Sequence, residues 1–133
     1  MSLRGVRGAT VADANTADAI LEATRELLLA ILAANPTLQP EDVASVTFTL
    51  TVDLDAVYPA QAARELNWTQ VPLMCAQEIP VPDGINRCIR VMLLWNTDLS
   101  QSEIQHVYLK EAVRLRPDLS FGRNDPLSDQ GGC

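Results

Sequence analysis

The residues most suited to binding or catalysis lie in two apolar segments. Residues 74–79 carry the thiol of Cys75 and the carboxylate of Glu78, and residues 88–95 carry the guanidinium of Arg90. The second segment is apolar at odd and even positions alike, the pattern of a strand that is covered on both faces. A guanidinium keeps its proton in a protein, and burying one without a partner is costly. Three interpretations of Arg90 stay open: an ion pair with Glu78 or an aspartate, a side chain that reaches solvent from the strand end, or a bond to a ligand anion.

The composition limits the kinds of partner. The chain of 133 residues has a net charge of −7 and an isoelectric point near 4.5, which argues against nucleic acid or an anionic membrane as its main partner. All but one of its basic residues are arginines, whose planar fork suits the recognition of carboxylates. A ligand with carboxylates is therefore compatible with this acidic chain, provided that several arginines converge.

The sequence gives little support for a metal site, a catalytic triad or a membrane span. Cys75, Cys88 and Cys133 have no repeated spacing and follow no secretory signal, so we interpret them as reduced thiols of a cytoplasmic protein. His106 is the only histidine, and no paired C-x-x-C or H-x-x-H motif occurs, so we expect no metal site and no His-based triad. The longest apolar run, residues 27–34, is much shorter than a membrane span.

The elements that must position these residues form a mixed α+β pattern of one domain. Apolar periodicity predicts strands over residues 3–10, 46–52, 71–79 and 88–95, and helices over about residues 16–35 and 58–66. Residues 104–109 fit either a helix continuation or a fifth strand. The first helix packs one stripe on the sheet, and we assign it no chemistry.

Two details of these strands bear on the site. The third and fourth strands follow each other within hairpin reach, so antiparallel pairing would bring Arg90 near Cys75 or Glu78. Cys75 and Glu78 have opposite parity, so a bulge or a strand end must separate them if both line one pocket. The hydroxyl side chains that alternate along residues 45–51 are interpreted as a polar surface that packs at a subunit contact or faces water, with too short a reach for catalysis.

An ordered set of short motifs resembles a known family. The motifs are Arg4-Gly-Val-Arg-Gly-Ala-Thr10, Asp53-Leu-Asp-Ala-Val-Tyr-Pro-Ala60 followed by Ala63-Arg-Glu65, Val71-Pro with Cys75-Ala-Gln-Glu78, Cys88-Ile-Arg-Val-Met92, and His106-Val-Tyr-Leu109 with Leu115-Arg-Pro-Asp-Leu119. In this order, and over nearly the whole domain, they resemble the monofunctional chorismate mutases of the AroH class.

The resemblance implies a reaction, a fold and an assembly. Such proteins convert chorismate to prephenate, an intramolecular Claisen rearrangement in the shikimate pathway toward phenylalanine and tyrosine. The implied fold is a mixed sheet of about five strands with two main helices, assembled as a pseudo-barrel homotrimer with active sites at the subunit interfaces. The domain is expected to span residues 1–121, and residues 122–133 to form a mobile tail. Since the reaction is unimolecular and chorismate carries two carboxylates, the resemblance implies an arginine-rich site without cofactor, metal or covalent nucleophile.

The resemblance also assigns roles to individual residues. The implied catalytic residues are Arg90, which donates to the ether oxygen and the side-chain carboxylate, with Arg7 and Glu78. Tyr108 would help Arg7 to hold that carboxylate, and Cys75 would join Glu78 at the ring hydroxyl. The other implied substrate-binding residues are Arg64, from a neighbouring subunit, Tyr58 against the ring, Met74 beside the hydroxyl, and Arg116 at the mouth of the site.

Three positions depart from the family pattern, and two of them, Gln61 and Met74, support an alternative. Gln61 stands where relatives often have a basic residue, Tyr58 where phenylalanine is common, and Met74 where threonine is frequent. The alternative is a non-catalytic trimeric domain that binds a dicarboxylate or serves regulation. A third interpretation, with Cys75 as a nucleophile, lacks an evident histidine base within reach.

Overall fold

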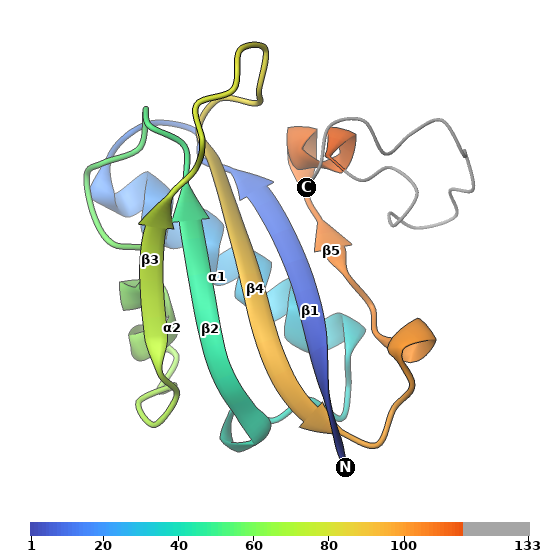
Figure 1. The fold of residues 1–133 in the computed structure, drawn as a ribbon. Coiled ribbons are helices and arrows are strands. Elements are labelled where there is room, and N and C mark those ends of the chain that lie inside the picture. The colour runs from blue at the N-terminus through green and yellow to red at the C-terminus, as the bar shows by residue number, and fades with distance from the viewer. Residues whose placement is uncertain (116–133) are drawn as a thin grey trace.

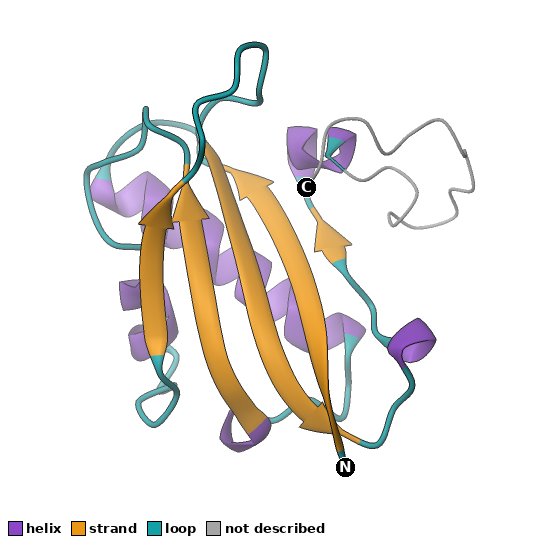
Figure 2. Ribbon diagram, viewed as in Figure 1, coloured by secondary structure: helices purple, strands orange, loops and turns teal. Residues whose placement is uncertain are grey.

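A computed structural model describes residues 1–115, which form a mixed sheet with helices on one face (Figure 1). The sheet has five strands in the order β3-β2-β4-β1-β5. The strands are β1 (Ser2–Val11), β2 (Val43–Leu50), β3 (Leu73–Gln77), β4 (Cys88–Thr97) and β5 (Val107–Tyr108), the α-helices are α1 (Ala17–Ala34) and α2 (Ala60–Glu65), and the 3₁₀ helices are η1 (Pro40–Asp42), η2 (Gln101–Glu103) and η3 (Lys110–Arg114). Both α-helices lie behind the sheet in Figure 2, and we call the opposite, front face the open face. The predicted single domain with five strands and two helices is confirmed.

The long helix α1 begins and ends where the sequence predicts. The hydroxyl of Thr16 accepts a hydrogen bond from the Ala19 N–H at 3.1 Å and caps the N-terminus, while Asn35 donates its backbone N–H to the Ile31 carbonyl at the C-terminus. The apolar stripe of α1 packs so closely on the sheet that a Cβ added at Gly8 in β1 would lie 2.8 Å from Cδ1 of Ile31. A residue without a side chain is therefore required where the helix crosses β1.

The strand register divides the residues of β4 between the two faces. Val91 joins Phe48 of β2 in the main core beneath the helices. Arg90 lies between Thr49 of β2 and Ala9 of β1 in the register, so the side chains of these three residues share the open face. The sequence pattern of a strand covered on both faces thus has a physical basis, with a large core on one side and a charged site on the other.

The predicted hairpin between the third and fourth strands is wrong. β3 pairs in parallel with β2, whereas β4 pairs antiparallel with both β2 and β1, so β2 separates β3 from β4. Parallel strands need a crossover connection, and α2 provides the one between β2 and β3. Residues 78–87 then carry the chain from the edge strand back to the centre of the sheet and form the loop that protrudes at the top of Figure 1.

The last described part of the chain adds a short edge to the sheet. Val107 and Tyr108 form β5, which pairs in parallel with Gly8 and Ala9 of β1. The open question about residues 104–109 is therefore answered by a strand of two residues. Arg116 and the expected tail over residues 122–133 lie outside the described residues. Within residues 1–115, no helix is both long enough and apolar enough to cross a membrane.

Candidate active site

An ion pair between Arg90 and Glu78 lies at the centre of the candidate site. Nε of Arg90 is 3.1 Å from Oε2 of Glu78, and the two side chains are only 19% and 14% exposed. Arg90 comes from the middle of β4, and Glu78 from the first position after β3. The Glu78 N–H donates to the Leu50 carbonyl at 2.8 Å, which fixes its backbone against the end of β2. We call these two residues the Arg90–Glu78 pair.

Thr49 supports this pair, a role that the sequence reasoning missed. Its hydroxyl donates a hydrogen bond to Oε2 of Glu78, the same oxygen that lies next to Arg90. The register of β2 and β4 places Thr49 directly opposite Arg90. The sequence reasoning treated the hydroxyl row as a passive surface because alternating threonines are common in half-exposed strands; the relevant signal was that Thr49 shares its face with a buried charge.

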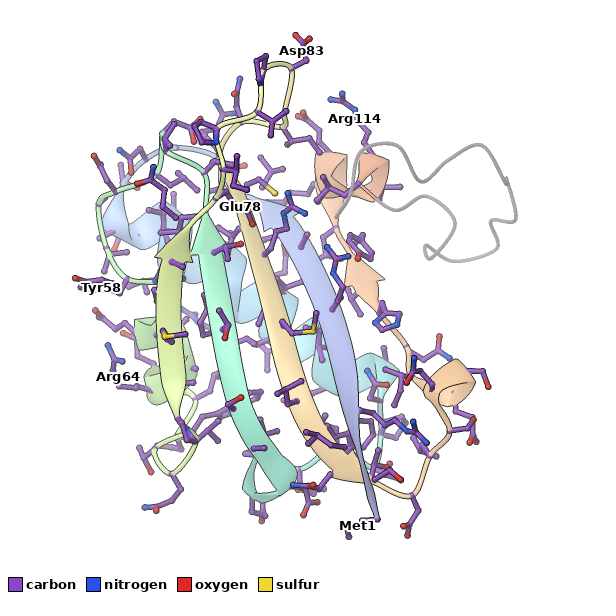
Figure 3. The ribbon with its side chains drawn as sticks, viewed as in Figure 1. Met1, Tyr58, Arg64, Glu78, Asp83 and Arg114 are labelled. Atoms are coloured by element: carbon purple, nitrogen blue, oxygen red, sulfur yellow. The ribbon has the colours of Figure 1, made fainter. Side chains whose placement is uncertain are left out.

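A cavity of about 580 Å³ opens above the Arg90–Glu78 pair. The pair and Cys88 line it from the sheet, residues 79–86 of the protruding loop line one side, and Arg114 and Leu115 line the other. Figure 3 shows Asp83 at the tip of the loop and Arg114 on η3 across from it. The cavity therefore combines a cationic donor, a carboxylate and a second arginine, which suits a small anionic ligand with a hydroxyl group.

Cys88 is a neutral thiol beside the Arg90–Glu78 pair. It is 2% exposed, and this burial raises the pKa of its thiol to about 11, an effect that Arg90 opposes and that the carboxylates of Glu78 and Asp53 reinforce. Because the thiolate is the nucleophilic form, Cys88 is inert near neutral pH. The site offers electrostatic contacts from this position, and covalent chemistry at Cys88 is not favoured.

Arg7 and Tyr108 lie on the same face but outside the lining of the cavity. Tyr108 pairs with Ala9, which in turn pairs with Arg90, so the two arginines and the tyrosine share the open face across three adjacent strands. The Arg7 guanidinium carbon lies 6.0 Å from the centroid of the Tyr108 ring. These residues extend the anion-binding surface away from the cavity, along β1 and β5.

A second group of predicted site residues lies at the far edge of the sheet. Tyr58 and Met74 are 72% and 63% exposed, and Arg64 is exposed on α2. Figure 3 shows Tyr58 and Arg64 pointing outward beyond β3, away from Glu78. We call Tyr58, Arg64 and Met74 the β3-edge group. Within one chain, the structure does not bring this group to the Arg90–Glu78 pair.

Cys75 is also separated from Glu78. It pairs with Phe48 and packs against the main core on the helix side of β3, whereas Glu78 bonds to Thr49 on the open face. The strand does end at Gln77, between the two residues, but the alternation of side chains continues and keeps them on opposite faces. The expected strand end between the two residues is therefore present, but within one chain it does not bring Cys75 to Glu78.

The sequence reasoning also missed two residues at the cavity wall. Arg114 and Leu115 line the cavity, and Leu115 joins Ala9, Cys88 and Tyr108 in a small apolar cluster on the open face. Their signal was weak because η3 is a short 3₁₀ helix without clear periodicity. Among residues 1–115, no group of three or more His, Cys, Asp or Glu residues is arranged to hold a metal ion.

Comparison with known proteins identifies the family. A sequence profile described as chorismate mutase type I matches residues 3–119 of the chain. The chain belongs to the chorismate mutase type I family. It is 53% identical over 117 residues to the chorismate mutase AroH of Thermus thermophilus, covering 88% of this chain and 96% of the relative. It is also 48% identical over 128 residues to the chorismate mutase AroH of Bacillus subtilis strain 168, covering 96% of this chain and all of the relative.

A solved structure agrees with this assignment. A chorismate mutase from Clostridium thermocellum superposes with a TM-score of 0.79 at 47% identity, over 81% of this chain and 96% of that chain. The AroH resemblance drawn from the motifs is confirmed. Family membership makes the chain an isomerase and favours a catalytic chorismate mutase over the non-catalytic binding domain.

Proposed function

We propose that this chorismate mutase converts chorismate to prephenate at the Arg90–Glu78 pair, as a step toward the aromatic amino acids. The observation that carries the proposal is a half-buried guanidinium held by a carboxylate at the floor of a cavity. In the rearrangement one carbon–oxygen bond breaks and one carbon–carbon bond forms within the same molecule. The protein therefore has to restrain a flexible substrate and stabilise the charge that develops on the ether oxygen.

Arg90 is the main electrostatic catalyst in this proposal. Its guanidinium has five N–H donors in a rigid fork, and the contact of Nε with Glu78 orients that fork within the cavity. We assign its terminal nitrogens to the ether oxygen and the side-chain carboxylate of chorismate. Arg7 and Tyr108 hold the same carboxylate, and Glu78 accepts a hydrogen bond from the ring hydroxyl.

The active unit in this proposal is a homotrimer with a site between each pair of subunits. The β3-edge group lies apart from the Arg90–Glu78 pair within one chain, so a complete site requires a second subunit to supply Tyr58, Arg64 and Met74. In the same proposal Cys75 comes from the β3 of the neighbouring subunit, and Arg116, which lies outside the described residues, takes part in substrate binding. We further propose a cytoplasmic location, because Cys75 and Cys88 are both free thiols.

The first experiment follows the loss of chorismate absorbance with purified protein. We expect Arg90→Ala to lower kcat much more than it raises KM, with a loss of about 2.7–4 kcal/mol in transition-state stabilisation, as for other preorganised donors. Arg25→Ala is the matched control, because Arg25 is exposed on α1. Absence of turnover by the unmodified protein would contradict the proposed activity, and near-normal turnover by Arg90→Ala would contradict the role of Arg90.

The second experiment tests whether sites are shared between subunits. Arg90→Ala and Arg64→Ala chains are unfolded, mixed in equal amounts and refolded together. In a trimer with interfacial sites, random assembly gives about one quarter of the sites both native residues, so activity should reappear. Arg90→Ala mixed with Glu78→Ala is the control, since both residues come from one subunit and no native site can form. Equal behaviour of the two mixtures would argue against the interfacial site.

A further inference from the structure

The backbone ladder that joins the edge strand β5 to β1 is short, although Val107 and Tyr108 also pack against the apolar clusters. It contains two residues, which pair with Gly8 and Ala9 of β1, and the Leu109 N–H donates to the Ala9 carbonyl at 2.9 Å. Tyr108, which the proposed function places on the substrate carboxylate, sits in this strand. Each additional contact between β1 and the residues around β5 therefore has a large share in the placement of Tyr108.

The imidazole of His106 provides one such contact. The backbone N–H of Arg7 donates a hydrogen bond to Nδ1 of His106 at 3.0 Å, and both residues are half-buried. His106 directly precedes β5, and Arg7 directly precedes the residues of β1 that pair with it. The side chain thus continues the β1–β5 ladder by one step, where a backbone carbonyl would ordinarily be the acceptor.

This hydrogen bond exists in only one protonation state. The backbone N–H is always a donor, so Nδ1 must offer its lone pair and the imidazole proton must be on Nε2. An imidazolium carries protons on both nitrogens and cannot accept. Protonation of His106 therefore removes the acceptor of a half-buried N–H and adds a positive charge beside Arg7.

We propose that neutral His106 is a positioning residue of the active site, which sets the placement of Arg7 relative to Tyr108 and loosens it when protonated. This inference rests on the proposed function of those two residues. His106 itself contacts the Arg7 backbone, so it acts on the substrate through its neighbours.

The surroundings of His106 confine this effect to the β1–β5 edge. Gln105, the preceding residue, is fixed to the end of α1, since Asn35 donates to its carbonyl at 2.9 Å and accepts from its N–H at 3.0 Å. Residues 27–34 of α1 carry no charge. The charged and titratable groups on the other flanking elements are Arg4 and Arg7 on β1, Glu103 on η2, Tyr108 on β5, and Lys110, Glu111 and Arg114 on η3.

Three of these charged groups contact residues other than His106. Arg4 donates to the Leu99 carbonyl at 3.1 Å, Glu103 accepts from the Ser100 N–H at 2.8 Å, and Lys110 lies 3.7 Å from Asp13. Arg7 is the charged residue that is bonded to His106 through its backbone. Protonation would therefore add a positive charge next to the residue whose backbone N–H the imidazole binds.

The test compares His106→Asn and His106→Ala with the unmodified enzyme. Asparagine offers an amide oxygen near the place of Nδ1 and does not titrate, whereas alanine removes the acceptor. Across about pH 8 to 5, the range in which histidine side chains ordinarily change their charge, we expect kcat/KM of the unmodified enzyme to fall with falling pH. His106→Asn should lack this decline. His106→Ala should show roughly tenfold lower kcat/KM than the unmodified enzyme near neutral pH, mainly through KM, and should also lack the decline.

Two outcomes would overturn the proposal. One is an acid decline in His106→Asn equal to that of the unmodified enzyme, and the other is unchanged kcat/KM in folded His106→Ala. A measurement without substrate keeps the test independent of the proposed activity. In ¹⁵N-edited NMR of the full chain, the Arg7 amide signal should shift with the same midpoint as the His106 ring signals. An Arg7 amide that ignores the titration of His106 would refute the hydrogen bond even if the enzyme failed to turn over chorismate.

Discussion

At the scale of single residues, Arg90 both pairs with Glu78 and lines the cavity. The sequence left an ion pair with Glu78 and a bond to a ligand as separate interpretations, yet the same guanidinium contacts Glu78 at 3.1 Å and lines the cavity. Arg90 was recognisable because a charge inside an apolar strand always needs an explanation. Thr49 was not recognisable, because threonine hydroxyls on a half-exposed strand usually form hydrogen bonds with water. Only the register with Arg90 shows the role of Thr49.

The Thr49 hydroxyl should matter for catalysis through Glu78. Thr49→Val keeps the shape of the side chain and removes the donor to Oε2 of Glu78. Hydrogen bonds to charged groups contribute about 1.5–3 kcal/mol, so we expect kcat/KM to fall by about one to two orders of magnitude.

Thr49→Ser is the control for this prediction. It retains the hydroxyl and loses only a methyl group, so its activity should remain close to that of the unmodified enzyme. Steady-state kinetics on the two variants decide the matter, and a Thr49→Val enzyme as active as Thr49→Ser would remove Thr49 from the site.

At the scale of elements, local signals gave reliable predictions and pairing partners did not. Caps and periodicity located α1 closely, since both are contained within the helix itself. The pairing of β3 depends on a crossover through α2 and on which strand is already central, and neither is encoded in the apolar pattern of residues 71–79. The same limit applies to β5, which has too few residues to show any periodicity.

The loop that forms one side of the cavity is anchored at its base by Asp53. Both carboxylate oxygens accept from the Arg87 N–H, at 3.1 and 2.9 Å, and the Thr51 hydroxyl also bonds to Asp53 at 2.5 Å. Arg87 has a φ of 50°, a conformation that is uncommon for a residue with a side chain. The Asp53 carboxylate therefore stabilises the unfavourable backbone conformation of Arg87, which directly precedes β4 and its residues Cys88 and Arg90.

Removal of this anchor should weaken both the fold and substrate binding. We expect Asp53→Ala to lower the free energy of unfolding by about 1 kcal/mol, the typical net contribution of an intramolecular hydrogen bond, and to raise KM because the loop wall loosens. Urea unfolding and steady-state kinetics measure the two effects. Asp98→Ala is the matched control, as that carboxylate is 86% exposed and contacts only the N-terminal amine in the described chain. Equal stability of the two variants would show that the anchor is unimportant.

At the scale of the whole molecule, the open face is the surface on which the proposed trimer would form its shared sites. Met92 and Met74 are 40% and 63% exposed on it, beside a charged site that lacks the β3-edge group. Exposed apolar side chains on a sheet face commonly mark an interface between chains. The apolar pattern of β4 could not predict an interface at Met92. A residue on this face of the strand has the same place in the alternation whether the face is exposed in a monomer or covered in an assembly.

A charge on the open face should therefore disrupt the proposed trimer. We expect Met92→Glu to reduce the mass measured by light scattering from about three times the 14.5 kDa of the chain toward a single chain, with a parallel loss of activity. Leu29→Glu is the matched control, because Leu29 is 48% exposed on α1, behind the sheet. A Met92→Glu protein with the mass and activity of the control would place the subunit interface elsewhere.

The hydrogen bond between Arg7 and His106 joins residues that are 99 positions apart, and this separation has a consequence during protein synthesis. A ribosome that has delivered β1 to β4 has released most of the core, but β1 still lacks its neighbour β5 and remains an open edge. Arg7 is synthesised near the beginning of translation, and its hydrogen-bond partner His106 is synthesised near the end. A chain broken off after Thr97 would therefore keep most of the core and the Arg90–Glu78 pair, lose Tyr108 and the cavity wall at Arg114, and expose a strand edge prone to pairing with other unfinished chains.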